Sequence, residues 1–185
     1  MSSLSPQPSK PRVLVVDDSA ANRLALEAVL DREYAVSTAE SGTQALELCR
    51  KEEFAVIVLD VRMPGLNGFE TAQALRKLEA TRSTPIIIFT TAYEQTVEQV
   101  TRGFAAGATD FLFSPVEPEI LKLKVATYVR IYLQHEALRL KVQELTAALA
   151  DLHAELARHG LTLPGLKSKL DKVEKTASDI DRQTQ

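Results

Sequence analysis

The chain contains few of the residues that build metal clusters or disulfide scaffolds. Its 185 residues include no Trp, three His and a single Cys, Cys49. One Cys excludes a disulfide framework and a cysteine-rich zinc module, and three scattered His argue against a structural zinc site. Cys49 lies in an apolar helical pattern, which is typical of a buried thiol.

Long apolar runs and an excess of basic residues are also missing. No apolar run approaches the ~20 residues that a membrane span needs, and the polar, Pro-rich start does not resemble a signal peptide. The net charge of −3 offers no basic field for nucleic acid. With 45% hydrophobic and 25% charged residues, the composition predicts a cytoplasmic globular protein with no membrane span and no nucleic-acid partner.

Apolar runs alternate with segments of helical spacing through the first two thirds of the chain. The predicted strands are Val13–Val16, Ala35–Ala39, Phe54–Leu59, Ile86–Phe89 and Asp110–Phe113, and the predicted helices between them are Asn22–Leu30, Thr43–Lys51, Phe69–Glu79 and Gln95–Ala106. Ser41 is expected to cap the second helix and Gly107 to end the fourth. Strict alternation favours a parallel sheet covered on both faces. We therefore predict an α/β, flavodoxin-like, doubly wound five-stranded sheet with its crevice at the carboxyl ends of the strands.

A long uninterrupted helix is predicted to follow the last strand. After Pro118, no Pro or Gly occurs through residue 159, a stretch far longer than an average helix of about 11–12 residues. Apolar residues recur there at alternating spacings of four and three, at Leu138, Val142, Leu145, Leu149, Leu152 and Leu156. This heptad pattern predicts a parallel homodimeric coiled coil through residues 131–156. The alternative is a long helix that folds against its own globular domain.

The predicted domain organisation has four parts. Residues 1–11 form a disordered leader, and residues 12–134 form the α/β domain. Residues 135–159 form the coiled-coil helix, which continues the last helix of that domain. Residues 160–185 form a linker and a short second helix with an apolar stripe from Leu166 to Ile180.

Three carboxylates follow two of the predicted strands. Asp17 and Asp18 come directly after the first strand, and Asp60 comes directly after the third. These strands are neighbours in a doubly wound sheet, so the three carboxylates are expected to meet in one crevice. Like charges raise one another's pKa, and Mg²⁺ would relieve their repulsion. Helix capping is the plainer interpretation of a single Asp, but it does not explain Asp17, Asp18 and Asp60 together.

Asp60 lies before a tight turn. The Pro64-Gly65 pair in the sequence Val61-Arg62-Met63-Pro64-Gly65 turns the chain and leaves the Asp60 carboxylate exposed at the base of the loop. A carboxylate in this position can act as a nucleophile toward phosphorus and form an aspartyl phosphate, with a bound metal bridging the attacking oxygen and the phosphoryl group.

Four segments together resemble the receiver domain of two-component response regulators. They are Val15-Val16-Asp17-Asp18-Ser19, Leu59-Asp60-Val61-Arg62-Met63-Pro64-Gly65-Leu66-Asn67-Gly68, Thr91-Ala92 and Gly107-Ala108-Thr109-Asp110-Phe111-Leu112. The resemblance covers about residues 11–134. It implies that a histidine kinase phosphorylates Asp60, and that Asp17, Asp18, Asp60 and the backbone carbonyl of Arg62 hold Mg²⁺.

The same resemblance implies a conformational switch. The family has a hydroxyl at the end of the fourth strand, which matches Thr90 when counted forward from Asp60. Matching the run Ile87-Ile88-Phe89 and the following Thr-Ala pair instead selects Thr91, and the register of the next helix favours Thr91. The switch aromatic of the fifth strand matches Phe111, which lacks the hydroxyl of Tyr and can switch only by packing.

Ser114 is the clearest departure from the family pattern. The family has Lys immediately before the residue that matches Pro115, and its ammonium group pairs with the phosphorylated carboxylate. Ser114 cannot supply that charge. The resemblance also implies that the Ser114–Pro115 bond can be cis.

These features predict a phosphorylation-controlled switch that is not an enzyme beyond its own phosphotransfer. Its output is expected to be contact with an unidentified downstream protein, or dimerisation through the C-terminal helix. Two alternatives remain open, namely a degenerate receiver that acts as a constitutive dimeric scaffold, which Ser114 favours, and the N-terminal regulatory fragment of a larger signalling protein. A Mg²⁺-dependent phosphatase on the same fold is disfavoured because no second general acid lies near Asp60.

Overall fold

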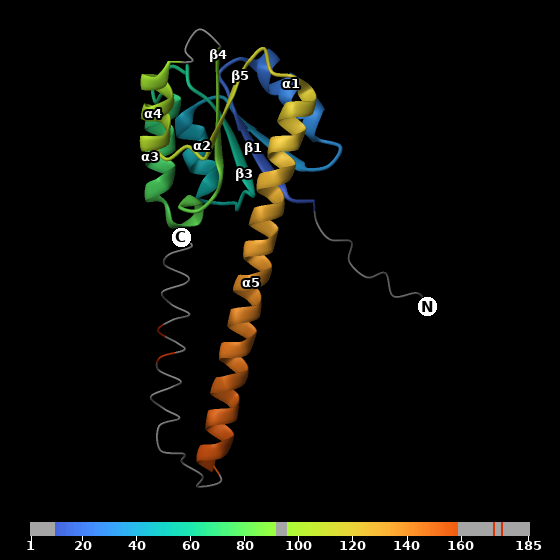
Figure 1. Cartoon of the computed structure of the whole chain (residues 1–185), viewed down its shortest axis with the longest axis vertical. Helices are drawn as coiled ribbons and strands as arrows, with labels where there is room; N and C mark the ends of the chain where they lie inside the picture. The colour runs from blue at the N-terminus through green and yellow to red at the C-terminus, as the bar shows by residue number, and fades with distance from the viewer. Residues whose placement is uncertain (1–9, 92–95, 159–171, 173–174, 176–185) are drawn as a thin grey trace, which may run out of the picture. The chain divides into compact units, whose positions relative to one another are not determined.

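The computed structural model describes residues 10–91, 96–158, 172 and 175, and five parallel strands alternate with helices along it (Figure 1). The strands are β1 (Arg12–Val16), β2 (Ala35–Ala39), β3 (Val56–Asp60), β4 (Ile86–Thr91) and β5 (Asp110–Ser114). The helices are α1 (Ala20–Leu30), α2 (Gly42–Cys49), α3 (Gly68–Lys77), the 3₁₀ turn η1 (Glu79–Thr81), α4 (Val97–Ala105) and α5 (Pro118–Arg158). The strand order β2-β1-β3-β4-β5 confirms the predicted flavodoxin-like, doubly wound fold.

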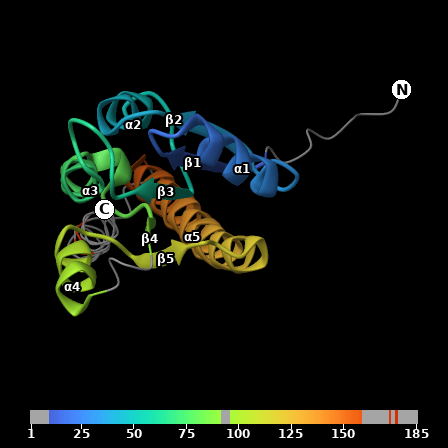
Figure 2. The same ribbon diagram turned by 90° about the horizontal axis from the view of Figure 1, so that it is seen from above.

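Two apolar cores lie on the two faces of this sheet. Successive side chains of β1 enter them in turn, with Leu14 and Val16 in one core and Val13 and Val15 in the other. Helices α2, α3 and α4 cover the first core, and α1 and the beginning of α5 cover the second (Figure 2). The central strands are therefore buried on both sides, which explains why their sequences are continuous apolar runs.

Helix ends follow the predicted signals. Ser41 caps α2 by accepting a hydrogen bond from the backbone N–H of Gln44, at 3.2 Å, and Gly107 follows α4 with a φ of +101°. Most boundaries differ from the prediction by one or two residues. Phe54 is buried but precedes β3, because an apolar run marks burial and does not mark the start of strand pairing.

Helix α5 runs without interruption for 41 residues, which confirms the predicted long helix. Its first turns bury Leu121, Val125 and Val129 in the second core. By its internal contacts the chain divides into two units, residues 1–132 and residues 133–185. The predicted leader up to residue 9 and the apolar stripe from Leu166 to Ile180 lie outside the described residues.

No helix in the part of the chain that the structure describes is both long enough and apolar enough to cross a membrane.

Candidate functional site

Three carboxylates meet at the carboxyl edge of the sheet. Strands β1 and β3 pair in parallel with Val16 opposite Leu59, so Asp17 and Asp60 follow at the same level. One oxygen from each of Asp17, Asp18 and Asp60 lies within 4.8 Å of the others. Main-chain pairing sets this proximity, which means that rotation of the side chains can relieve the repulsion only partly.

The loop between β1 and α1 holds Asp17 in place. One carboxylate oxygen of Asp17 accepts a hydrogen bond from the backbone N–H of Ser19, at 2.8 Å, and the other accepts one from the side-chain amide of Asn22, at 3.0 Å. Arg23 donates to the backbone carbonyls of Asp17 and Asp18, at 2.7 and 3.0 Å. The sequence analysis missed Asn22 and Arg23. Their position in the first turn of the helix after the acidic pair was the available signal.

The loop after β3 fixes Asp60. The backbone N–H of Arg62 donates to the Asp60 carboxylate at 3.1 Å, and Gly65 turns the chain with a φ of +77°. The start of α3 lies so close that a Cβ atom at Gly68 would come within 2.2 Å of the Asp60 carbonyl oxygen. Asn67 and Glu70 cap this helix reciprocally. The carboxylate of Asp60 is therefore presented by a tightly packed loop.

Burial and like charge act together on these acids. Burial raises the pKa of Asp60 to about 7, and the neighbouring charge of Asp17 adds to the effect. Burial also raises the pKa of Asp17, partly offset by its hydrogen bonds from Ser19 and Asn22. Both carboxylates are thus harder to ionise than exposed ones.

An oxygen-only donor set of this kind suits a hard divalent cation. Mg²⁺ binds one or two carboxylates and keeps several waters, and the three Asp side chains offer oxygens at one point. A carboxylate oxygen that accepts one hydrogen bond retains a second lone pair, so the contacts of Asp17 do not block coordination. The residues present therefore fit Mg²⁺.

A cavity of about 300 Å³ opens beside the acids. Its lining consists of Asp18, Asn22, Asp60, Arg62, Phe89, Thr90 and Ser114. Thr90 belongs to this wall, since β4 pairs with β3 so that Phe89 lies opposite Asp60. Thr91 ends β4 opposite Ser114, and its side chain lies outside the described part of the structure.

Phe111 does not line this cavity. Thr90 also borders a smaller pocket that Phe111, Val100 and Phe113 line. The Phe111 ring is buried and meets the Phe104 ring edge-on, at 5.1 Å between centroids. Gly103 permits this packing, because a Cβ there would come within 2.2 Å of the Phe111 ring. Sequence analysis did not identify Gly103. A glycine is needed there because α4 packs closely against the Phe111 ring of β5, and this contact is not visible in the local sequence.

Ser114 closes the cavity at the carboxyl end of β5. It lines the cavity with Asp60 and Thr90, and the Ser114–Pro115 bond is cis, as the resemblance implied. The fifth strand therefore presents a short neutral hydroxyl where a cationic side chain was expected from the family pattern.

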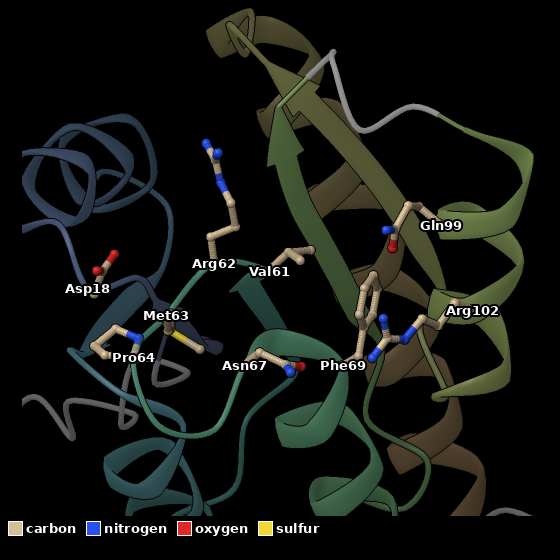
Figure 3. A pocket seen from close by; sticks show the side chains of 9 residues that line it. All are labelled: Asp18, Val61, Arg62, Met63, Pro64, Asn67, Phe69, Gln99 and Arg102. Atoms are coloured by element: carbon tan, nitrogen blue, oxygen red, sulfur yellow. The ribbon is translucent and has the colours of Figure 1, made fainter.

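A second, shallower pocket adjoins the site (Figure 3). It has a volume of about 480 Å³ and lies between the loop after β3 and helix α4. Arg62 rises from that loop between Asp18 on one side and Gln99 on the other. Arg102 of α4 lies over the ring of Phe69, at 5.0 Å from its centroid, so its charge is held at the α3 side of this pocket.

Without divalent cations, we expect the pH dependence of stability to report Asp60. The folded-state pKa of Asp60, about 7, exceeds its ordinary value of 3.8. Its contribution to the free energy of unfolding is therefore fully present below pH 4 and is lost as the pH rises through 7. Asp60→Asn should gain about 1–2 kcal/mol over the wild type at pH 8 in EDTA, allowing for the solvent that the carboxylate still contacts.

Urea unfolding of both proteins at pH 5 and pH 8, in EDTA and in Mg²⁺, measures this difference. Mg²⁺ should reduce it, because the cation favours the ionised carboxylates. Equal pH dependence of the wild type and Asp60→Asn would contradict the raised pKa of Asp60.

Comparison with known proteins agrees with this fold. The family model for the response regulator receiver domain matches residues 13–126. The response regulator PleD of Caulobacter vibrioides is 38% identical over 129 residues, which are 69% of this chain and 28% of PleD. This chain thus matches little more than a quarter of that relative's length.

Solved structures give the same result. The chemotaxis response regulator CheY4 of Vibrio cholerae is 40% identical with a TM-score of 0.60, covering 65% of this chain and 99% of CheY4. The receiver domain of the sensor histidine kinase PA1611 from Pseudomonas aeruginosa PAO1 has a magnesium ion coordinated in its active site cleft. It is 26% identical with a TM-score of 0.60, over 65% of this chain and 98% of that domain. The family match extends over more than half of the chain, and the chain belongs to the response regulator receiver domain family.

Proposed function

We propose that this chain is a phosphorylation-controlled switch of a cytoplasmic two-component system, with Asp60 as the phosphoacceptor. The observation that carries the proposal is the convergence of Asp17, Asp18 and Asp60 within 4.8 Å at the carboxyl edge of the sheet. Receiver domains take phosphate from histidine kinases, and a cognate kinase of that class is the proposed donor. The chain performs only its own phosphotransfer.

The geometry supports nucleophilic attack by Asp60. Its carboxylate borders the cavity, and the backbone N–H of Arg62 orients one of its oxygens. An Asp60 oxygen forms the bond to phosphorus while the bond from phosphorus to the donor's leaving group breaks. When bound at these acids, Mg²⁺ would neutralise charge on the carboxylates and the phosphoryl oxygens. Asp17, Asp18, Asp60 and the backbone carbonyl of Arg62 are the proposed ligands.

Thr90 is the better supported switch hydroxyl. Sequence matching preferred Thr91, but Thr90 lines both the cavity of Asp60 and the pocket of Phe111. A hydroxyl at Thr90 can therefore respond to a phosphoryl group and alter the packing of Phe111. Because Phe111 has no hydroxyl of its own, the proposed change is a repacking of its ring among Phe104 and Phe113.

The proposed output is a parallel homodimer through residues 131–156. Leu138, Leu145 and Leu152 recur every seven residues along α5 and are 59%, 54% and 51% exposed. Burying such a stripe against a second copy would remove large apolar side chains from water. The downstream protein that recognises the dimer is not identified by these features.

Two other functions have specific support. A constitutive dimeric scaffold is favoured by Ser114, since the strong contact that a Lys makes with the phosphoryl group is missing. A regulatory part of a larger signalling protein is favoured by PleD, of which the chain matches only 28%.

Phosphorylation by acetyl phosphate tests the proposal. With Mg²⁺, the wild type should form an acyl phosphate that maps to Asp60. Asp60→Asn should lose labelling, and EDTA should reduce the labelling of the wild type more than tenfold. Asp31→Asn is the matched control, because Asp31 is an exposed acid that ends α1. Full labelling of Asp60→Asn would disprove the assignment. An unlabelled wild type that is still dimeric would favour the scaffold.

A further inference from the structure

The cavity beside Asp60 has an unbalanced charge. Asp18 and Asp60 both line it, and Asp17 lies within 4.8 Å of them. A phosphoryl group on Asp60 adds further negative charge. Ser114 contributes no positive charge to balance it. Among the described residues that line the cavity, Arg62 is the one with a positive charge.

The position of Arg62 follows from the loop that presents Asp60. Its backbone N–H donates to the Asp60 carboxylate, at 3.1 Å, so its Cα is tied to the nucleophile. Its side chain borders both the cavity of Asp60 and the adjoining pocket. In Figure 3 it stands between Asp18 and Gln99, with its guanidinium at the end away from Pro64. The side chain of Arg62 is exposed and forms part of the wall of the cavity of Asp60.

Other nearby cations lie outside the lining of the cavity of Asp60. Both contacts of Arg23 go to backbone carbonyls of the β1–α1 loop. Arg102 lies over the Phe69 ring and lines the pocket without lining the cavity. Lys124 pairs with Asp110. None of these three described residues borders the cavity of Asp60.

We propose that Arg62 supplies the positive charge that Ser114 does not, by contacting the phosphoryl group on Asp60. The inference rests on phosphorylation of Asp60. An Asp60 oxygen forms the bond to phosphorus, and the phosphorus–oxygen bond to acetate breaks with its electron pair leaving on acetate. The guanidinium stays protonated throughout and donates two hydrogen bonds to the phosphoryl oxygens. Arg62 is thus a catalytic residue of the phosphotransfer, on a different element from the Lys that the family uses.

A double-mutant cycle at positions 62 and 114 tests the proposal. The labelling rate with acetyl phosphate is measured at saturating Mg²⁺ for the wild type, Arg62→Gln, Ser114→Lys and the double variant. Arg62→Gln should lower the rate about tenfold, and Arg62→Lys should restore part of it. In the Ser114→Lys background, Arg62→Gln should change the rate less than about twofold, because the new ammonium replaces the lost charge.

Two further measurements separate the explanations. Arg102→Gln is the matched control, since it removes a neighbouring charge outside the cavity, and its labelling rate should stay within about twofold of the wild type. The urea midpoint of Arg62→Gln should equal that of the wild type, as expected for an exposed side chain.

The outcomes are distinct. If the wild type is labelled on Asp60 and Arg62→Gln is labelled equally fast, the inference is wrong and the proposed function stands. An equal loss of rate in both backgrounds also overturns it, because Arg62 then acts independently of the charge at position 114. If the wild type acquires no acyl phosphate, the proposed function fails and the inference fails with it.

Discussion

Replacing Leu145 and Leu152 together by Glu is expected to convert a dimeric protein into a monomer. Both side chains lie on the heptad stripe of α5 and are more than half exposed in the single chain. In a parallel dimer each of these side chains would face the same residue of the partner helix across the coiled-coil interface. The double variant therefore places four carboxylates in an apolar interface. Burial of a large apolar side chain contributes about 1.5–3 kcal/mol, and these changes remove four such contributions per dimer.

Light scattering or sedimentation across a range of concentrations measures this change. Leu140→Glu is the matched control, because Leu140 is 58% exposed but lies two residues after Leu138, on another face of the helix. It should remain dimeric. A chain that ends at Leu133 should be monomeric as well. A monomeric wild type would instead support a helix that folds on its own domain, and a dimeric truncation would place the interface on the receiver.

Replacing Arg76 by Leu is expected to lower the free energy of unfolding by about 3–5 kcal/mol. Arg76 is a half-buried cation near the end of α3 that bonds to three backbone carbonyls, two in the segment between α3 and β4 and one after α4. Its Nε and Nη2 donate to the carbonyl of Gly107, at 3.0 and 2.7 Å. Its Nη1 donates to the carbonyls of Thr81 and Thr84, at 2.8 and 2.7 Å. Leu would leave three partly buried acceptors without this donor.

Urea unfolding checks the loss, with Lys77→Leu as the control. Lys77 is the exposed neighbour of Arg76 on the same helix, and its replacement should cost less than about 0.5 kcal/mol. Arg76→Lys should fall between the two, because an ammonium keeps the charge but cannot span three carbonyls. A loss below 1 kcal/mol for Arg76→Leu would show that water replaces the guanidinium.

The contrast between Asp60 and Arg76 shows what the sequence could predict. Asp60 follows a run of apolar residues that is long enough to mark a buried strand, and parallel pairing brings the ends of neighbouring strands together. The acid cluster was therefore predictable from local pattern and topology. Arg76 bonds to Gly107, which lies 31 residues away in the sequence. No local sequence pattern predicts such a contact.

The choice between Thr90 and Thr91 stays a prediction for a related reason. Matching Thr91 places one extra residue in the loop of residues 82–85 before β4, whereas counting forward from Asp60 selects Thr90. Thr90 lines the cavity of Asp60, and the side chain of Thr91 lies outside the described part of the structure. A one-residue shift along a strand sends a side chain to the opposite face, so alignment alone could not distinguish the two.

The continuity of α5 from residue 118 to residue 158 has a consequence for how the receivers meet. In the proposed dimer, each receiver is joined to the seam by helix and not by a flexible linker. Linking two domains sets an effective concentration that depends on the length and stiffness of the connection. A stiff helical connection favours a contact between the receivers only where its geometry lets the two surfaces meet. We therefore expect phosphorylation to act by altering a weak contact between receivers, without any change in the coiled coil.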